Sequence, residues 1–379
     1  MPDPTTAGPV DRRETSPGQV PGPALKVPTL DEVARRAGVS RSVASRAMNN
    51  ARNVSPAKRE AVARAATELG YVPNATARAL ATSTGGSVVL AVSHDDPALF
   101  GDPFFSQVLV GVAAALDRSE LDLTLMLASS ERGQARLERL LRSRRSDGVM
   151  LMALRGDDPL NRLAAATELP VVLGGRPLHG EPRWYVDVDN RGGARLATEH
   201  LLASGRRRIA TITGPMDLQA SVARYEGFAD AMAVARLDPD RVEHADFSFE
   251  GGARATTRLL AAHPDLDGVF AASDNMAAGA VRALKAAGRR VPEDVAVVGF
   301  DDLEVARHTE PALTTVSQPI RGLGQEMATM LVRLIGGESP TPVILPTRLV
   351  VGGGGGGGGG GAPPPPPPPP PRPRGPRAE

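Results

Sequence analysis

Apolar runs of strand length recur along most of the chain, and they constrain its fold more than any other feature. The runs are SVVLAV at 87–92, GVMLMAL at 148–154, PVVLG at 170–174, RIATIT at 208–213, GVFAA at 268–272 and VAVVGF at 295–300. Amphipathic stretches of helical length separate them, and this alternation is typical of parallel, doubly wound sheets. Because residues 87–351 exceed one sheet of average size, we predict two α/β lobes that bind ligands at the carboxyl ends of their strands.

The two ends of the chain differ in composition from this region. Residues 1–28 are rich in Pro, Gly and Thr, and residues 352–379 contain an unbroken run of glycine followed by one of proline. Such segments bury too little apolar surface to fold, so we expect a disordered leader and a low-complexity tail. Cysteine is absent, and we find neither an apolar run of membrane-spanning length nor a secretory signal. These features predict a cytoplasmic protein.

Residues 29–73 carry helix signals without a strand pattern. The capping box from Thr29 to Glu32 predicts a first helix that ends at about residue 37. A turn through Gly38 then leads to Ser40, which can cap a second helix, and Ser55 before a proline opens a third. Asn74 can cap a further helical piece, which is too short to be stable alone. We interpret residues 74–86 as a hinge helix and linker.

Charged residues are also distributed unevenly along the chain. Residues 29–82 hold nine Lys and Arg against four Asp and Glu, whereas the long segment after them is acidic. A basic module joined to an acidic one indicates a polyanionic partner at one end of the chain. The first two predicted helices also have the spacing of a helix-turn-helix, whose second helix reads bases in the DNA major groove. The spacing alone fits an ordinary three-helix domain equally well, and a basic cluster can be merely a solvated surface.

Residues 29–82 resemble the DNA-binding head of the LacI family of bacterial transcription regulators nearly without a gap. The matching segment begins TLDEVARRAGVSRSVASRAMNN and ends YVPNATARALAT. The resemblance implies base contacts from Arg41, Ser42 and Arg46, and phosphate contacts from Thr29, Ser40, Ser45, Asn49 and Ser55. It also implies a hinge helix that folds on the operator, with Leu80 wedged into the minor groove. We add Asn74 and Ala77 of that helix to the DNA-binding residues.

The resemblance continues through residues 85–351 in several short blocks. Among them are DPFFSQVLVGV, VDVDNRGGARLATEHLLASG, ARYEGF, ASDNMAAGAVRAL and VAVVGFDD. They imply two periplasmic-binding-protein-like lobes that clamp a small effector, a sugar or a related metabolite. The expected effector-binding residues are Asp95, Phe104, Phe105, Asp189, Arg224, Phe247, Ser273, Asp274 and Asp301.

Some of these positions also make physical sense, and some have competing interpretations. Arg224 and Asp301 could form bidentate bonds to ligand hydroxyls from opposite walls. The Phe104 and Phe105 pair can offer a flat face to a sugar ring, although such pairs are often core residues. Asp274 can instead cap its helix. Because Ser273 replaces the asparagine usual in the family, and Asp95 lies in an atypical loop, the identity of the effector stays open.

The leading hypothesis is a homodimer or tetramer that represses transcription by binding a pseudo-palindromic operator, under the control of the effector. A solute-binding receptor would share the two lobes, but it would need an export signal and would not need a DNA-binding head. An enzyme is the third alternative. The chain has no P-loop, no G-x-S-x-G elbow and no H-E-x-x-H motif. We therefore expect no catalysis, no cofactor, no metal and no membrane partner.

Overall fold

The computed structural model describes residues 28–48, 53–71, 85–92, 103–128, 130–143, 146–153, 155–156, 158–180 and 182–353. The chain divides into two compact units, Met1–Ser83 and Thr84–Glu379. Three predicted segments lie wholly or mostly outside the described residues: the leader, the short hinge helix and the glycine and proline tail. Within the described ranges, no helix is both long and apolar enough to cross a membrane.

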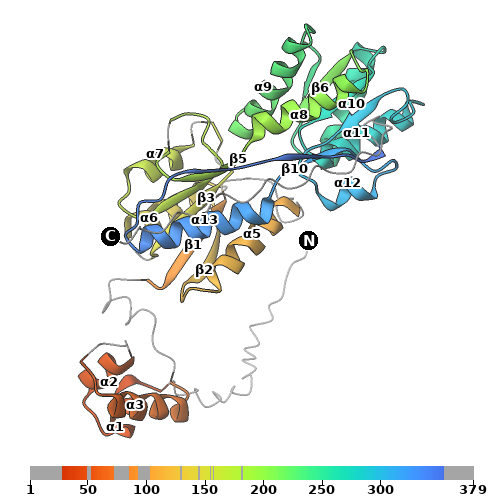
Figure 1. Ribbon diagram of the computed structural model, residues 1–379. Coiled ribbons are helices and arrows are strands. Elements are labelled where there is room, and N and C mark those ends of the chain that lie inside the picture. Colours follow the sequence, from red (N-terminus) through yellow and green to blue (C-terminus); the bar gives the residue numbers. More distant parts are fainter. Residues whose placement is uncertain are drawn as a thin grey trace, which may run out of the picture. The chain divides into compact units, whose positions relative to one another are not determined.

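In the described part of the first unit the chain forms three helices, as the start signals predict (Figure 1). They are α1 (Leu30–Arg36), α2 (Arg41–Met48) and α3 (Pro56–Leu69). Both bonds of the Thr29 and Glu32 capping box are present at the start of α1. Gly38 turns the chain between α1 and α2 with φ of 65°, and Gly70 ends α3 with φ of 64°, a region that glycine adopts without strain. The helices enclose a small core that consists of Val33, Ala34, Ala44, Val62, Ala65 and Ala66.

The first lobe of the second unit is a six-stranded parallel sheet with the order β11-β5-β4-β3-β1-β2. Its strands are β1 (Ser87–Val92), β2 (Asp122–Leu127), β3 (Gly148–Met152), β4 (Val171–Gly174), β5 (Tyr185–Val188) and β11 (Val343–Leu345). Helices α5 (Pro103–Leu116) and α13 (Ile320–Ile335) cover one face of the sheet. Helices α6 (Glu131–Ser143) and α7 (Pro159–Ala166) cover the other. Both faces are therefore buried, which explains the continuous apolar runs of β1 and β3.

The second lobe is a four-stranded parallel sheet with the order β7-β6-β8-β9. Its strands are β6 (Ile209–Thr213), β7 (Val242–His244), β8 (Gly268–Ala271) and β9 (Ala296–Val298). Helices α8 (Asn190–Ala203) and α9 (Gln219–Val234) pack on one face. Helices α10 (Phe249–Ala262) and α11 (Asp274–Ala286) pack on the other, and the short α12 (Glu304–His308) follows β9. The two predicted parallel α/β lobes are thus confirmed.

The chain passes between the lobes three times. It leaves the first lobe after β5 and enters α8, and it returns from β10 (Thr315–Ser317) to α13. After β11 it passes to β12 (Arg348–Val350), which pairs antiparallel with β10. The lobes are therefore joined by three short connections beside the carboxyl ends of their strands.

Several strands were not predicted from the apolar runs. The strand β7 has only three residues, none of them buried, and most of β2 is exposed, so neither has a continuous apolar pattern. Another difference is that the predicted run at 148–154 ends as a strand at Met152, because Ala153 takes a left-handed φ of 57°. Short or exposed strands are held by pairing with distant neighbours, which apolar patterning does not reveal.

Candidate functional site

A cavity of about 400 Å³ lies between the two lobes of the second unit. Residues at or just beyond the carboxyl ends of β3, β4 and β5 line it from the first lobe. Residues that follow β7 and β9, together with the start of α9, line it from the second. Ligands of doubly wound sheets bind at these strand ends, so the cavity lies where the fold itself predicts a site.

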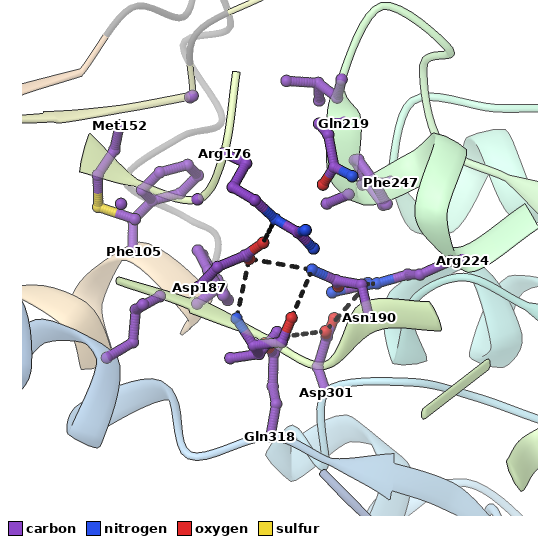
Figure 2. Close-up of a pocket in the computed structure, with 18 of the residues that line it drawn as sticks. Phe105, Met152, Arg176, Asp187, Asn190, Gln219, Arg224, Phe247, Asp301 and Gln318 are labelled. Atoms are coloured by element: carbon purple, nitrogen blue, oxygen red, sulfur yellow. Dashed lines mark hydrogen bonds and ion pairs between the residues drawn. The ribbon is translucent and has the colours of Figure 1, made fainter. Parts of the chain in front are cut away.

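A buried arginine organises the polar wall of the cavity (Figure 2). The Arg224 guanidinium lies on α9 and donates through Nε to Asn190 Oδ1 at 2.8 Å. Its Nη1 donates to the Ala272 carbonyl at 2.6 Å and contacts Asp301 Oδ1 at 3.3 Å. The same Asp301 oxygen accepts from Gln318 Nε2 at 2.5 Å. The arginine is also stacked 3.7 Å from the ring centre of Phe300, so it is held from several sides in one orientation.

A second charged pair extends this wall from the first lobe. Arg176 follows β4 and donates through Nε to Asp187 Oδ2 at 2.7 Å. The other oxygen of Asp187 accepts from the backbone N–H of Val188 at 2.8 Å and from Asn190 Nδ2 at 3.2 Å. Asn190 thereby joins the two pairs, because its amide nitrogen bonds Asp187 while its oxygen bonds Arg224. Charged and amide groups from both lobes form one connected network, which suits a ligand with several hydroxyls.

The remaining walls are largely apolar. The rings of Phe104 and Phe105, at the start of α5, lie 5.3 Å apart in an edge-to-face arrangement, and both line the cavity. Phe247 lines it from the second lobe with a left-handed φ of 65°. Near it, Gln219 Oε1 is buried and accepts no hydrogen bond from any residue that the structure describes. A ligand donor could satisfy this oxygen, which would otherwise cost free energy to bury.

Burial shifts the pKa of two groups in this region. It lowers the pKa of the Arg224 guanidinium, while the carboxylates of Asp301 and Asp187 oppose that shift. Burial also raises the pKa of Asp274 well above 3.8, and the charge of Asp301 adds to the effect. Hydrogen bonds from Thr315 and from the Leu303 N–H act in the opposite direction on Asp274. The two shifts have the sign expected when charged groups lose contact with water.

The cavity brings together five of the nine predicted effector residues: Phe104, Phe105, Arg224, Phe247 and Asp301. Asp95 lies outside the described residues. The other three are absent from the described lining, and their side chains are engaged elsewhere. Asp189 caps α8 by accepting from the Gly192 N–H, and Ser273 caps α11 by accepting from the Met276 N–H. Asp274 bonds Leu303 and Thr315 inside the second lobe.

Sequence reasoning also missed several lining residues, namely Arg176, Asp187, Asn190, Gln219 and Gln318. In the VDVDN segment it selected Asp189, which lies beyond β5 and three residues before the glycine whose N–H it binds. That spacing is a cap signal and could have been recognised. Asp187 lies within the strand and is buried, a rare environment for an aspartate that only its partners from other segments explain.

The first unit presents most of the predicted DNA-binding side chains to solvent. Thr29, Ser40, Arg41, Ser42, Arg46 and Ser55 are exposed, and Ser45 is half-buried. Arg46 Nε donates to the Ser42 carbonyl at 3.2 Å, and Arg41 lies 3.5 Å from Asp31 across an exposed ion pair. These contacts are weak and exposed, so both guanidinium groups can turn to another acceptor. Asn49, Asn74, Ala77 and Leu80 lie outside the described residues.

Comparisons with known proteins give matches in both units of the chain. A model described as "Bacterial regulatory proteins, lacI family" matches residues 29–74, and a "Periplasmic binding protein-like domain" matches residues 198–354. The HTH-type transcriptional regulator CelR of Thermobifida fusca is 47% identical over 331 residues, which cover 86% of this chain and 97% of that protein. The ribose operon repressor of Escherichia coli (strain K12) is 36% identical over 319 residues, which cover 81% of this chain and 93% of that one.

Solved structures give the same result. A complex of the transcriptional regulator CelR with cellobiose has a TM-score of 0.69 and 44% identity, and the match covers 86% of this chain and all of that one. A lac repressor dimer bound to operator and the anti-inducer ONPF has a TM-score of 0.76 and 29% identity, with coverages of 87% and 99%. The similarity therefore extends over both units of the chain.

Proposed function

The chain belongs to the LacI family of bacterial regulatory proteins, and from this premise we propose how its two units work together. It is a sequence-specific DNA-binding regulator of transcription, and a repressor, whose affinity for its operator is controlled by a sugar. The observation that carries this function is that one chain contains both a ligand cavity and a helix-turn-helix. The cavity lies between the lobes and holds the buried network of Arg224, Asn190 and Asp301.

The effector that fits the cavity best is a β-linked disaccharide such as cellobiose. Aromatic side chains on two walls can cover the apolar faces of sugar rings, and the charged and amide groups can bind the hydroxyls. The buried Gln219 oxygen offers one further acceptor. A volume of about 400 Å³ is in the range of small-ligand sites and leaves room for two rings. The solved CelR complex with cellobiose, 44% identical to this chain, supports the same choice.

DNA reading is assigned to residues 29–73 and the hinge to residues 74–86. Arg41, Ser42 and Arg46 contact bases from α2, whose arginines can donate two bonds to guanine. The phosphate contacts come from Thr29, Ser40, Ser45, Asn49 and Ser55. Asn74, Ala77 and Leu80 act in the minor groove. These roles are proposals that rest on the family resemblance and, for the described residues, on their position in the head.

The protein acts as a homodimer on a pseudo-palindromic operator, so that each head reads one half-site. Residues 87–351 supply both the effector site and the dimer contact. Among the described residues, large apolar side chains remain exposed on neighbouring elements of the first lobe, namely Val110 on α5 and Leu125 and Leu127 on β2. Exposed apolar groups of this kind favour a contact with another protein surface.

Control by the effector needs only a difference in its affinity for two arrangements of the lobes. A sugar that binds one arrangement better shifts the population toward it and changes how well two hinge segments meet on the operator. Typical coupling of about 1–3 kcal/mol corresponds to roughly 5- to 150-fold in affinity. The protein works in the cytoplasm through binding alone, without catalysis.

The experiment that tests this function begins with selection of binding sites from a random-sequence DNA library by the full-length protein. We expect pseudo-palindromic sites, whose mobility shift changes by roughly 5- to 150-fold with cellobiose and not with the α-linked disaccharide maltose. Failure to enrich any sequence would exclude DNA reading. Enrichment without a response to any sugar would exclude sugar control, and a response to maltose alone would exclude cellobiose as the effector.

A further inference from the structure

A carboxylic acid that lies behind the effector cavity makes bonds that neither a ligand contact nor a helix cap explains. Asp274 begins α11 and is fully buried. Its Oδ2 accepts from the Leu303 N–H at 2.7 Å, and its Oδ1 accepts from the Thr315 hydroxyl at 2.5 Å. The cap of α11 is Ser273, so Asp274 is not needed for that role. The free-energy cost of burying its carboxyl group must therefore be offset by these two hydrogen bonds.

The two bonds reach the segments that deliver the polar wall of the cavity. Leu303 comes two residues after Asp301, and Thr315 belongs to β10, three residues before Gln318. The segments also meet directly, because the Asp301 N–H donates to the Val316 carbonyl at 2.8 Å and Gln318 donates to Asp301. One carboxyl group thus ties the loop after β9 to the strand beside it.

Two neighbours of Asp274 support this interpretation. The Ala272 carbonyl, two residues before it, accepts from Arg224, so the same turn also orients the arginine of the effector site. Gly299 passes so close that any side chain at that position would collide with Asp274 Oδ1. Gly299 follows β9 directly, so the chain approaches the Asp274 carboxyl group closely just before it reaches Asp301.

We propose that Asp274 is a positioning residue of the effector site, which holds the segments carrying Asp301 and Gln318 in the arrangement that binds the ligand. It does not contact the ligand itself. The proposal rests on the proposed function in one respect, namely that the cavity binds the effector. The hydrogen bonds of Asp274 to the two segments can be tested without any sugar.

The test compares Asp274→Ala with Asp274→Asn in the full-length protein. Alanine removes both ties, and we expect cellobiose affinity in calorimetry to fall by about 10- to 100-fold, as for leaving buried hydrogen-bond donors without a partner. Asparagine can accept from the Leu303 N–H and donate to the Thr315 oxygen, so it should restore affinity to within a few fold. Operator affinity without sugar should stay unchanged in both. The matched control is Thr256→Val, because that buried hydroxyl bonds only its own helix.

Hydrogen exchange at the Leu303 amide provides a readout that needs no ligand. We expect exchange at least tenfold faster in Asp274→Ala, and near the wild-type rate in Asp274→Asn and Thr256→Val. If Asp274→Ala does not fold, Thr315→Val removes one tie without leaving a cavity and should weaken cellobiose binding several-fold. Wild-type affinity and exchange in Asp274→Ala, or in Thr315→Val if it must substitute, would overturn the proposal. If the wild-type protein binds no cellobiose, the effector assignment fails while the exchange rates still decide the role of Asp274.

Discussion

Replacing Asp301 by asparagine isolates the contribution of one charge to effector binding. Asp301 has a φ of 111°, a backbone conformation that few residues with a side chain adopt. Asparagine tolerates such positive φ values better than alanine does, and it keeps the shape of the side chain. The substitution therefore removes the negative charge opposite Arg224 without adding a change in backbone preference.

The structure sets the size of the expected effect. The side chains of Arg224 and Asp301 are only 7% and 8% exposed, so solvent does little to screen their interaction. Breaking a buried pair costs about 3–5 kcal/mol, and the lower end applies because asparagine still accepts a hydrogen bond. About 3 kcal/mol corresponds to a fall in Tm of about 6 °C. A carboxylate bonded to two ligand hydroxyls gains about 1 kcal/mol more per bond than a neutral acceptor, which predicts about 30-fold weaker binding.

Calorimetry with cellobiose and a thermal melt measure these two quantities, and a mobility shift without sugar should give wild-type operator affinity. Asp302→Asn is the matched control. The neighbouring Asp302 also has a left-handed φ, of 61°, but its carboxylate pairs with Arg307 near the surface and does not appear in the described cavity lining. Equal effector affinity in Asp301→Asn and the wild type, or an equal loss in Asp302→Asn, would refute the role assigned to the Asp301 charge.

Three further outcomes follow from the same contacts. Arg46→Ala should abolish discrimination between operator and unrelated DNA in a mobility shift while circular dichroism stays unchanged; intact discrimination would exclude Arg46 as a base contact. Thr29→Ala removes the capping box and should destabilise the head by about 0.5–2 kcal/mol in urea unfolding, whereas an unchanged midpoint would contradict the cap. Asp274→Asn should flatten the pH dependence of stability. Because the folded pKa of Asp274 is raised, the wild type loses stability as pH rises above 3.8, and a variant with the same slope in pH-dependent melts would disprove that shift.

Local signals in the sequence were sufficient for the helical head and for the main strands. A capping box joins residues three apart, and a proline after a serine sets the start of a helix, so both act through neighbouring residues alone. The longest apolar runs became strands because both faces of the first sheet are covered. Arg224 and Asp301, which the family resemblance implied, both line the cavity. For Asp301 a local signal pointed the same way, because an acidic residue after a buried strand lies where this fold binds ligands.

The sequence by itself thus determined where the helices of the head and the longest apolar strands form, and at which end of those strands the cavity lies. Only the tertiary structure showed that Asp187 lines the cavity, that Asp189 caps α8, and that Asp274 is bonded to Leu303 and Thr315 in the interior. The physical reason is the range of the interactions. A cap is satisfied by an amide three residues away, whereas the buried carboxyl groups are satisfied by Arg176, Leu303 and Thr315, which come from distant segments. Which oxygen meets which donor depends on how those segments pack, and no local pattern contains that information.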